Sequence, residues 1–113
     1  MIRVSFRRIR PGKEGKLREW LEELMRRQDE VRETFRRETV RHEQAFILED
    51  QGGSIMVYAI EAADHAQGAR AVATSTLPID LQHKEVMRDV LGAPVAITPI
   101  YDCALDPPAQ PSG

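Results

Sequence analysis

Residues 2–24, IRVSFRRIRPGKEGKLREWLEEL, change their hydrophobic period within a few positions. Every second residue from Ile2 to Phe6 is apolar, which predicts a strand with one buried face. Pro11 and Gly12 interrupt this strand, because proline cannot donate to a sheet and glycine turns freely. Beyond the break, apolar residues recur at intervals of three and four. The stretch therefore predicts a strand followed by an amphipathic helix.

We expect this helix to run without a break from Lys13 to Glu38 and to extend beyond the sheet. Its length would be roughly 39 Å, against about 27 Å for an eight-residue strand. A break near residues 26–29 is the alternative. Trp20 lies on the apolar stripe and is expected in the core. The full stripe comprises Leu17, Trp20, Leu21, Leu24, Val31 and Phe35, with Gln28 as a polar exception.

The rest of the chain predicts two further strands, two helices and a last strand, in that order. The predicted ranges are 39–49 and 54–61 for strands joined by a DQGG hairpin, 64–74 for a helix capped by Asp64, 81–91 for a short helix, and 95–102 for the last strand. This order, β-α-β-β-α-β with an extra short helix before the last strand, is that of a ferredoxin-like α+β domain with a four-stranded antiparallel sheet. Residues 1–103 form the single domain, and the Pro-rich tail 104–113 is expected to be disordered.

Composition limits the function classes. Residues 1–41 hold 13 of the 16 Lys and Arg. Glutamates at helical spacing lie among these basic residues, and no cluster of aromatic residues on which bases could stack lies near them, so we expect no nucleic-acid binding. The two oppositely charged halves are expected to attract each other within a subunit or across a dimer. No apolar run is long enough for a membrane span, and the N-terminus lacks the apolar core of a signal peptide, so we expect a cytoplasmic protein without a membrane partner.

The opening stretch resembles that of the dimeric α+β barrel proteins, in which a strand leads through Pro-Gly-Lys into an amphipathic helix. This superfamily includes antibiotic-biosynthesis monooxygenases, EthD-like proteins and rhamnose mutarotases. The hairpin and the final short strand fit the same pattern, so the resemblance covers residues 1–103. The stretches PID and HEQAF are most similar to small stand-alone bacterial proteins without an assigned activity. The resemblance implies a homodimer in which two sheets pack face to face and close a barrel.

A ferredoxin-like sheet carries its helices on one face, so the other face needs a cover. We expect this uncovered face to carry a mixed row of apolar and polar residues, a composition typical of an interface or a ligand site. The row comprises Ser5, Glu43, Ala45, Ile47, Met56, Tyr58, Ile60, Thr98 and Ile100. The alternate row of the second strand, residues 40–48 in steps of two, would take this place if a bulge shifted the register.

The candidate catalytic residues are Glu43, Tyr58 and His83, with Arg7 as an anchor for an anionic group. A pocket beside Tyr58 would raise the pKa of Glu43 and make it a base. The alternative is a structural pairing of Glu43 with Arg3 or Arg7. Further ligand contacts are assigned to Met56 and Thr98.

The stretch TLPIDLQHKEVM, residues 76–87, places Asp80 three residues before His83. Asp80 is expected to cap the short helix by accepting from the backbone N–H of residue 82 or 83. His83, near a helix N-terminus, is expected to be neutral, either as a bystander or as a usable base or ligand. His42 and His65 are expected at or near the surface. Three scattered histidines and the lone Cys103 predict no metal site and no cofactor.

Two functions remain open from the sequence. The first is an enzyme, a homodimer that binds a small, partly apolar organic molecule and promotes proton transfer or cofactor-free oxygenation. The second is a non-catalytic dimer that serves as a ligand sensor or accessory protein. The second function predicts no cavity near the roughly 300 Å³ typical of ligand sites.

Overall fold

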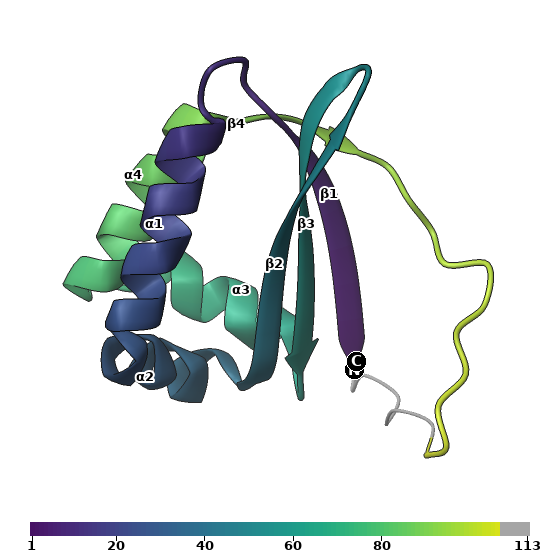
Figure 1. Ribbon diagram of the computed structural model, residues 1–113. Helices are drawn as coiled ribbons and strands as arrows, with labels where there is room; N and C mark the ends of the chain where they lie inside the picture. Colours follow the sequence, from purple (N-terminus) through teal and green to yellow (C-terminus); the bar gives the residue numbers. More distant parts are fainter. Residues whose placement is uncertain (107–113) are drawn as a thin grey trace.

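Four strands form one antiparallel sheet in the order β2-β3-β1-β4, so β3 and β1 are its central strands (Figure 1). The computed structural model describes residues 1–106. The strands are β1 (Ile2–Ile9), β2 (Val40–Asp50), β3 (Gly53–Ala62) and β4 (Leu91–Val95). The helices are α1 (Glu14–Arg26), α2 (Gln28–Glu38), α3 (His65–Thr74) and α4 (Pro78–Val90). The predicted ferredoxin-like α+β fold and its four-stranded antiparallel sheet are confirmed, with a pair of helices in each position where the simple motif has one.

The long first helix is broken, so the prediction of a continuous helix is wrong. Arg27 separates α1 from α2 with φ −119° and ψ 39°, outside the helical region. The break lies where the sequence alternative had placed it, in residues 26–29. On the two sides of the break the helices pack on different partners, α1 on α4 and α2 on α3. A single rod of 26 residues would overhang a strand of eight residues.

The predicted hairpin between β2 and β3 is confirmed. Residues 51 and 52 form its turn, and Gly53 follows with φ +117°, a conformation that favours glycine. The N-cap of α3 is also confirmed, since the Asp64 carboxylate accepts a hydrogen bond from the backbone N–H of Gln67 at 3.0 Å.

The region around α4 differs from the prediction in two ways. The helix begins at Pro78, three residues before the expected start, because proline fits the first helical position without needing a hydrogen bond. Asp80 is therefore inside the first turn, and its predicted role as N-cap is wrong; its carboxylate instead accepts from the Ser75 hydroxyl. The last strand occupies Leu91–Val95 and not residues 95–102. Pro94 is tolerated there because β4 is an edge strand.

The members of the predicted row that lie in β1, β2 and β3 share one face of the sheet, but that face is the covered one, and Thr98 and Ile100 lie after β4, outside the sheet. Ser5 pairs with Tyr58 and Arg7 with Met56, so these four side chains point the same way, toward the helices. The assignment of this row to the uncovered face is wrong. A register shift between Val40 and His42 marks the bulge that the sequence analysis had considered.

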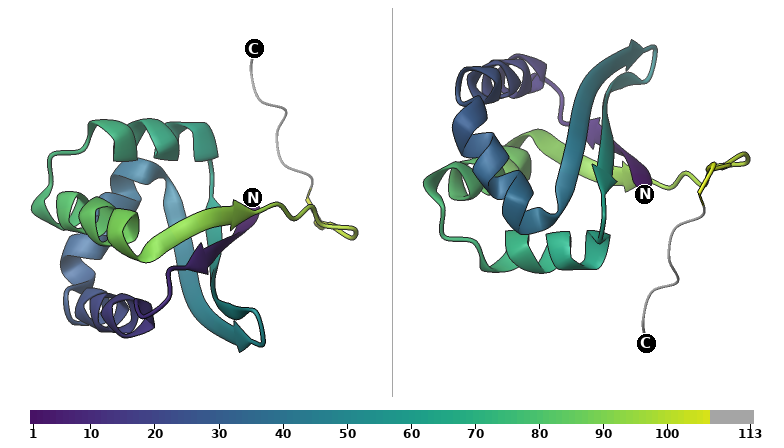
Figure 2. Two further views of the ribbon diagram at one scale, coloured as in Figure 1. Left: turned by 90° about the horizontal axis from the view of Figure 1, so that it is seen from above. Right: turned by 90° about the horizontal axis from the view of Figure 1, so that it is seen from below.

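The helices all lie on one side of the sheet in both further views (Figure 2). The opposite side, here called the open face, carries large apolar side chains that remain exposed: Ile2 (67%), Val4 (45%), Phe46 (52%) and Leu48 (51%). Residues 96–106 follow β4 as an irregular extended segment. The predicted tail falls mostly on residues 107–113, which lie outside the described residues.

The hydrophobic core lies between the sheet and the helices at the end where β1, α1 and α4 meet. Its buried members are Ile9, Leu17, Met56, Val90 and Leu91. Lys13 and Lys16 of α1 both bind Asp89 of α4, at 3.2 and 2.6 Å, so one attraction between the basic and acidic halves acts within the subunit. Within residues 1–106, no helix combines the length and the apolar character needed to cross a bilayer.

Candidate functional site

A cavity of about 200 Å³, here called the inner cavity, lies between β2 and β3 on one side and the helices on the other. Its apolar walls come from β3 and from all four helices. The apolar lining comprises Leu24, Val31, Phe35, Ile60, Val72 and Ile79. Its polar lining comprises Thr34, Glu38, Glu43, Tyr58, Asp80, His83 and Lys84.

Tyr58 of β3 and Glu43 of β2 are joined across the sheet by a hydrogen bond from the phenol to the Glu43 carboxylate. Burial raises the pKa of Glu43, and the hydrogen bond from Tyr58 opposes this rise. Burial and the neighbouring Glu43 together raise the pKa of Tyr58 well above its usual range, so the phenol keeps its proton and acts as a donor. The alternative that Glu43 serves to pair with Arg3 or Arg7 is wrong, because its partner is Tyr58.

His83 projects from α4 and is held by Trp20 of α1. The indole Nε1 donates a hydrogen bond to His83 Nδ1 at 2.9 Å. An indole N–H can only donate, so Nδ1 must accept, and the proton of the neutral ring lies on Nε2. Burial lowers the pKa of His83, with Asp80 acting in the opposite direction, which agrees with the expected neutral imidazole. His83 therefore offers a hydrogen-bond donor at Nε2.

Two more carboxyl groups, Glu38 at the end of α2 and Asp80 at the start of α4, line the inner cavity. Burial raises the pKa of Glu38 to about 7, and the nearby Asp80 and Glu43 add to the rise. Gly68 of α3 allows the backbone of Glu38 to approach α3 closely, because a Cβ atom at position 68 would lie 2.9 Å from the Glu38 carbonyl oxygen. Within residues 1–106, no three His, Cys, Asp or Glu side chains are arranged to hold a metal ion.

A second, wider hollow of about 570 Å³, here called the outer basin, adjoins the inner cavity. Tyr58, His83 and Lys84 line both spaces and form the boundary between them. The remaining lining residues of the outer basin are Ser5, Arg7, Arg10, Met56, Met87, Arg88 and Leu91. The outer basin is open to the surface, and the inner cavity, at about 200 Å³, is smaller than the roughly 300 Å³ typical of ligand sites, so volume alone does not separate the two functions left open by the sequence.

The structure brings together most of the residues proposed from the sequence. Glu43, Tyr58 and His83 share the inner cavity, while Arg7 and Met56 line the outer basin beside them. Two other predicted positions, both histidines, lie elsewhere: His42 is exposed on β2, and His65 is partly buried, with its Nε2 2.8 Å from the Met1 carbonyl oxygen.

Thr98, predicted as a ligand contact, is exposed in the segment after β4. This placement follows from the earlier position of the last strand. The sequence does not indicate two further residues of the site. Trp20 is buried, as its place on the apolar stripe predicts, but its N–H also reaches His83. Glu38 ends the predicted helix, and nothing in the local sequence sets it apart.

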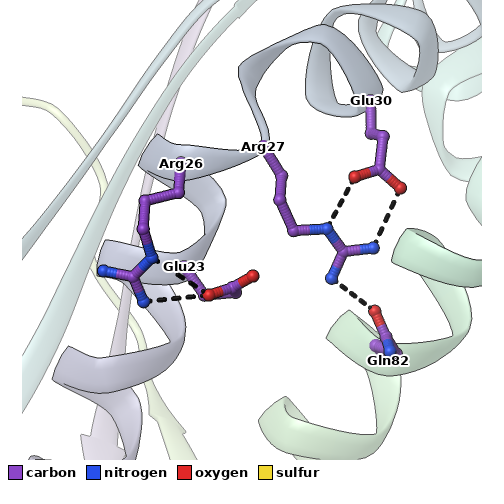
Figure 3. A network of polar contacts seen from close by, with 5 residues as sticks. All are labelled: Glu23, Arg26, Arg27, Glu30 and Gln82. Atoms are coloured by element: carbon purple, nitrogen blue, oxygen red, sulfur yellow. Dashed lines mark hydrogen bonds and ion pairs between the residues drawn. The ribbon is translucent and has the colours of Figure 1, made fainter.

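The break between α1 and α2 is tied to α4 close to the site (Figure 3). Arg27 binds Glu30 through Nε and Nη2 at 2.6 and 2.9 Å, and its Nη1 donates to Gln82 Oε1 at 2.6 Å. Gln82 directly precedes His83 in α4. Among the described residues, the neighbouring Arg26 pairs only with Glu23, within its own helix. Arg27 thus connects the start of α2 to the helix turn that carries His83.

Comparison with known proteins identifies a family and no individual relative. A search of curated proteins and a search of solved structures each found no match. The model of a family described as "Family of unknown function (DUF6176)" matches residues 2–107, nearly the whole chain. The protein whose inner cavity and outer basin are described above therefore belongs to the DUF6176 family.

Proposed function

We propose that the protein is an enzyme that binds a small, partly apolar organic molecule between its sheet and its helices and moves a proton on it. One observation carries the proposal: Glu43, Tyr58 and His83 come from three separate elements and converge on one largely apolar cavity. A carboxyl group of raised pKa, a phenol and a neutral imidazole in such a cavity are the groups that general acid–base chemistry uses.

Glu43 is the proposed base. Its carboxylate takes a proton from a carbon next to a carbonyl group; the C–H bond breaks and its electron pair moves onto the carbonyl oxygen. His83 Nε2–H donates a hydrogen bond to that oxygen and stabilises its developing negative charge. Tyr58 holds Glu43 in position through the phenol hydrogen bond. The enolate then takes the proton back at another carbon in an isomerase, or reacts with O₂ in a cofactor-free oxygenase.

This assignment changes the role of His83 that the sequence suggested. A base needs a free lone pair, and the only unprotonated nitrogen of His83 already accepts the hydrogen bond from Trp20. His83 is consequently proposed as a donor to the substrate, and Glu43 as the proton acceptor.

The proposal is tested by identifying a retained ligand and following its protons. Protein purified from the cells that naturally produce it is examined by native mass spectrometry, and the released molecule is incubated with fresh enzyme in D₂O. Proton NMR then reports exchange of a C–H proton for deuterium. Glu43→Gln should slow this exchange by a factor on the order of 100, the lower end for general base catalysis.

Glu49→Gln is the matched control, because Glu49 lies on the same strand but is exposed. It should exchange at the wild-type rate. Exchange by Glu43→Gln at the wild-type rate, or a retained molecule that shows no enzyme-dependent exchange, would refute the proposed enzyme. The latter result, with binding intact, is what the alternative of a non-catalytic ligand sensor predicts.

We further propose that the protein is a homodimer joined through the open face. The exposed apolar side chains of Val4, Phe46 and Leu48 support this proposal, because an apolar patch on the sheet face that no helix covers is typical of an interface. The site proposed above lies on the other side of the sheet, within one subunit. Dimerisation would therefore support the sheet and leave the ligand entrance free.

A further inference from the structure

We infer that the outer basin binds the anionic end of the ligand, a carboxylate or phosphate group, while its uncharged end enters the inner cavity. The inference rests on the proposed function in one respect only, in that it treats the two adjoining spaces as one ligand site. It adds the chemical class of the ligand: a small organic acid or phosphate ester with an apolar remainder.

The charges that line the outer basin are all of one sign. Arg7, Arg10, Lys84 and Arg88 line it, and none of its lining residues within residues 1–106 is acidic. Elsewhere in the described chain, most arginines of α1 and α2 pair with a glutamate or aspartate on the same helix. Four cationic side chains around one hollow form a field that favours an anion.

Two of these arginines are held in place by the backbone of the edge strand. Arg7 Nη2 donates to the Gly92 carbonyl at 2.7 Å, and Arg10 Nε donates to the Leu91 carbonyl at 2.9 Å. Carbonyl groups orient the guanidinium groups without neutralising them. Arg7 Nε is buried and has no hydrogen-bond partner among the described residues. A fixed guanidinium with unused donors suits an oxyanion, which can accept two parallel hydrogen bonds.

The inner cavity has the opposite character, and this fixes the orientation of the ligand. Three carboxyl groups, those of Glu38, Glu43 and Asp80, line it beside one cation, Lys84, so it is less favourable to an anion than the outer basin, whereas an uncharged group meets its apolar walls. A dry apolar cavity of about 150 Å³ is large enough to hold a benzene ring. The inner cavity, at about 200 Å³, accepts a ring of that size. Tyr58 and His83, which line both spaces, then lie beside the bond between the two ends of the ligand.

The test uses three probes that share a phenyl ring and differ in the charged group: benzoate, phenyl phosphate and the neutral benzamide. Their affinities for the full-length protein are measured by calorimetry at constant ionic strength, with thermal unfolding as a second readout. The tighter-binding anion identifies the carboxylate or the phosphate as the preferred group. Because hydrogen bonds to a charged group are stronger than those to a neutral one, we expect the preferred anion to bind at least about tenfold more tightly than benzamide. Inorganic phosphate, which lacks the ring, should bind more weakly than phenyl phosphate.

Variants locate the binding. Arg7→Gln and Arg10→Gln should each weaken anion binding by about tenfold or more. Either change also removes a hydrogen bond to β4 and could disturb folding. Arg88→Gln is therefore the third variant, because Arg88 is an exposed residue of the basin; this variant should fold normally and still bind anions more weakly. Arg18→Gln is the control, since this exposed arginine of α1 lines neither space and should leave affinity unchanged.

The inference is overturned by equal affinity for benzoate and benzamide, by basin variants that bind as the wild type does, or by no anion binding up to about 10 mM. Equal affinity for inorganic phosphate and phenyl phosphate would refute the orientation, because the ring would then make no contact. These outcomes are separate from those of the proposed reaction. Anion binding that depends on Arg88, without enzyme-dependent proton exchange, would refute only the proposed reaction, whereas proton exchange without anion binding would refute only this inference.

Discussion

Trp20 Nε1 donates a hydrogen bond to His83 Nδ1 over 2.9 Å, and this contact fixes the tautomer of the imidazole. The two rings also lie near each other at an angle, with centroids 6.1 Å apart. Trp20 is buried in α1, and His83 lines both the inner cavity and the outer basin from α4. The contact therefore couples the packing of two helices to the proton position on a residue of the candidate site.

Replacement of Trp20 by Phe keeps an aromatic ring but removes the donor. The hydrogen bond to Nδ1 competes with protonation there, so its loss should raise the pKa of His83 and allow the proton to occupy either nitrogen, while burial, the main cause of the lowered pKa, remains. Nitrogen-15 NMR of the histidine ring reports both effects. Stability should fall by about 1 kcal/mol, the usual contribution of one hydrogen bond. A wild-type spectrum with the proton on Nδ1 would contradict the assignment.

Glu38 makes stability depend on pH near neutrality. Its pKa rises from 4.5 to about 7 on folding because the carboxyl group is buried. Between pH 4.5 and pH 7, Glu38 keeps its proton in the folded protein but has lost it in the unfolded chain. The contribution of protonated Glu38 to stability is therefore complete below pH 4.5 and is lost as the pH rises through 7. A shift of one unit corresponds to about 1.36 kcal/mol, and solvent screening reduces the total, so we expect a loss of about 1 to 2 kcal/mol.

Urea unfolding at pH 5 and pH 8 measures this change. Glu38→Gln cannot ionise and should remove this part of the pH dependence, which makes the variant more stable than the wild type at pH 8. Glu61→Gln is the control, because Glu61 is exposed on β3 and should follow the wild-type curve. Equal slopes for Glu38→Gln and the wild type would show that another group is responsible.

Arg27 and Arg26 form a matched pair at the break between α1 and α2 (Figure 3). Arg27 donates a hydrogen bond to Gln82 of α4, whereas the Arg26 side chain bonds to Glu23 of its own helix. Arg27→Ala should lower the thermal midpoint more than Arg26→Ala and should broaden the NMR signals of the His83 ring. A larger effect of Arg26→Ala would mean that the contact with α4 contributes nothing to the position of that turn.

The proposed dimer predicts a difference between the two sides of the molecule. Phe46→Asp places a charge on the open face and should weaken self-association at least about tenfold, because a charge cannot be buried there without a partner. Met25→Asp changes an exposed apolar residue of α1, away from the open face, and should leave association intact. Sedimentation equilibrium at micromolar concentration distinguishes them. A wild-type particle of 12.8 kDa under these conditions would refute the dimer.

The sequence determined the order and type of the secondary-structure elements. The change of period around Pro11, the glycine-bearing hairpin and the Asp64 cap depend on contacts between residues close in the chain, and the structure has each of them. The elements misjudged from sequence lie where packing overrides local pattern. The first helix breaks at Arg27, beyond which α2 packs on α3 while α1 packs on α4, and the last strand starts at Leu91, where it pairs with Ile9 of β1.

The candidate site shows the same division. Residue type and alternation grouped Glu43, Tyr58 and Met56 correctly on one face, because side chains of a strand alternate wherever the strand lies. The sequence could not show which face the helices cover, since both faces of this sheet carry apolar residues. The pairing of Trp20 with His83, 63 residues apart, and the burial of Glu38 likewise exist only in the folded chain. Tertiary packing alone sets the distances and the desolvation that give these groups their proton affinities.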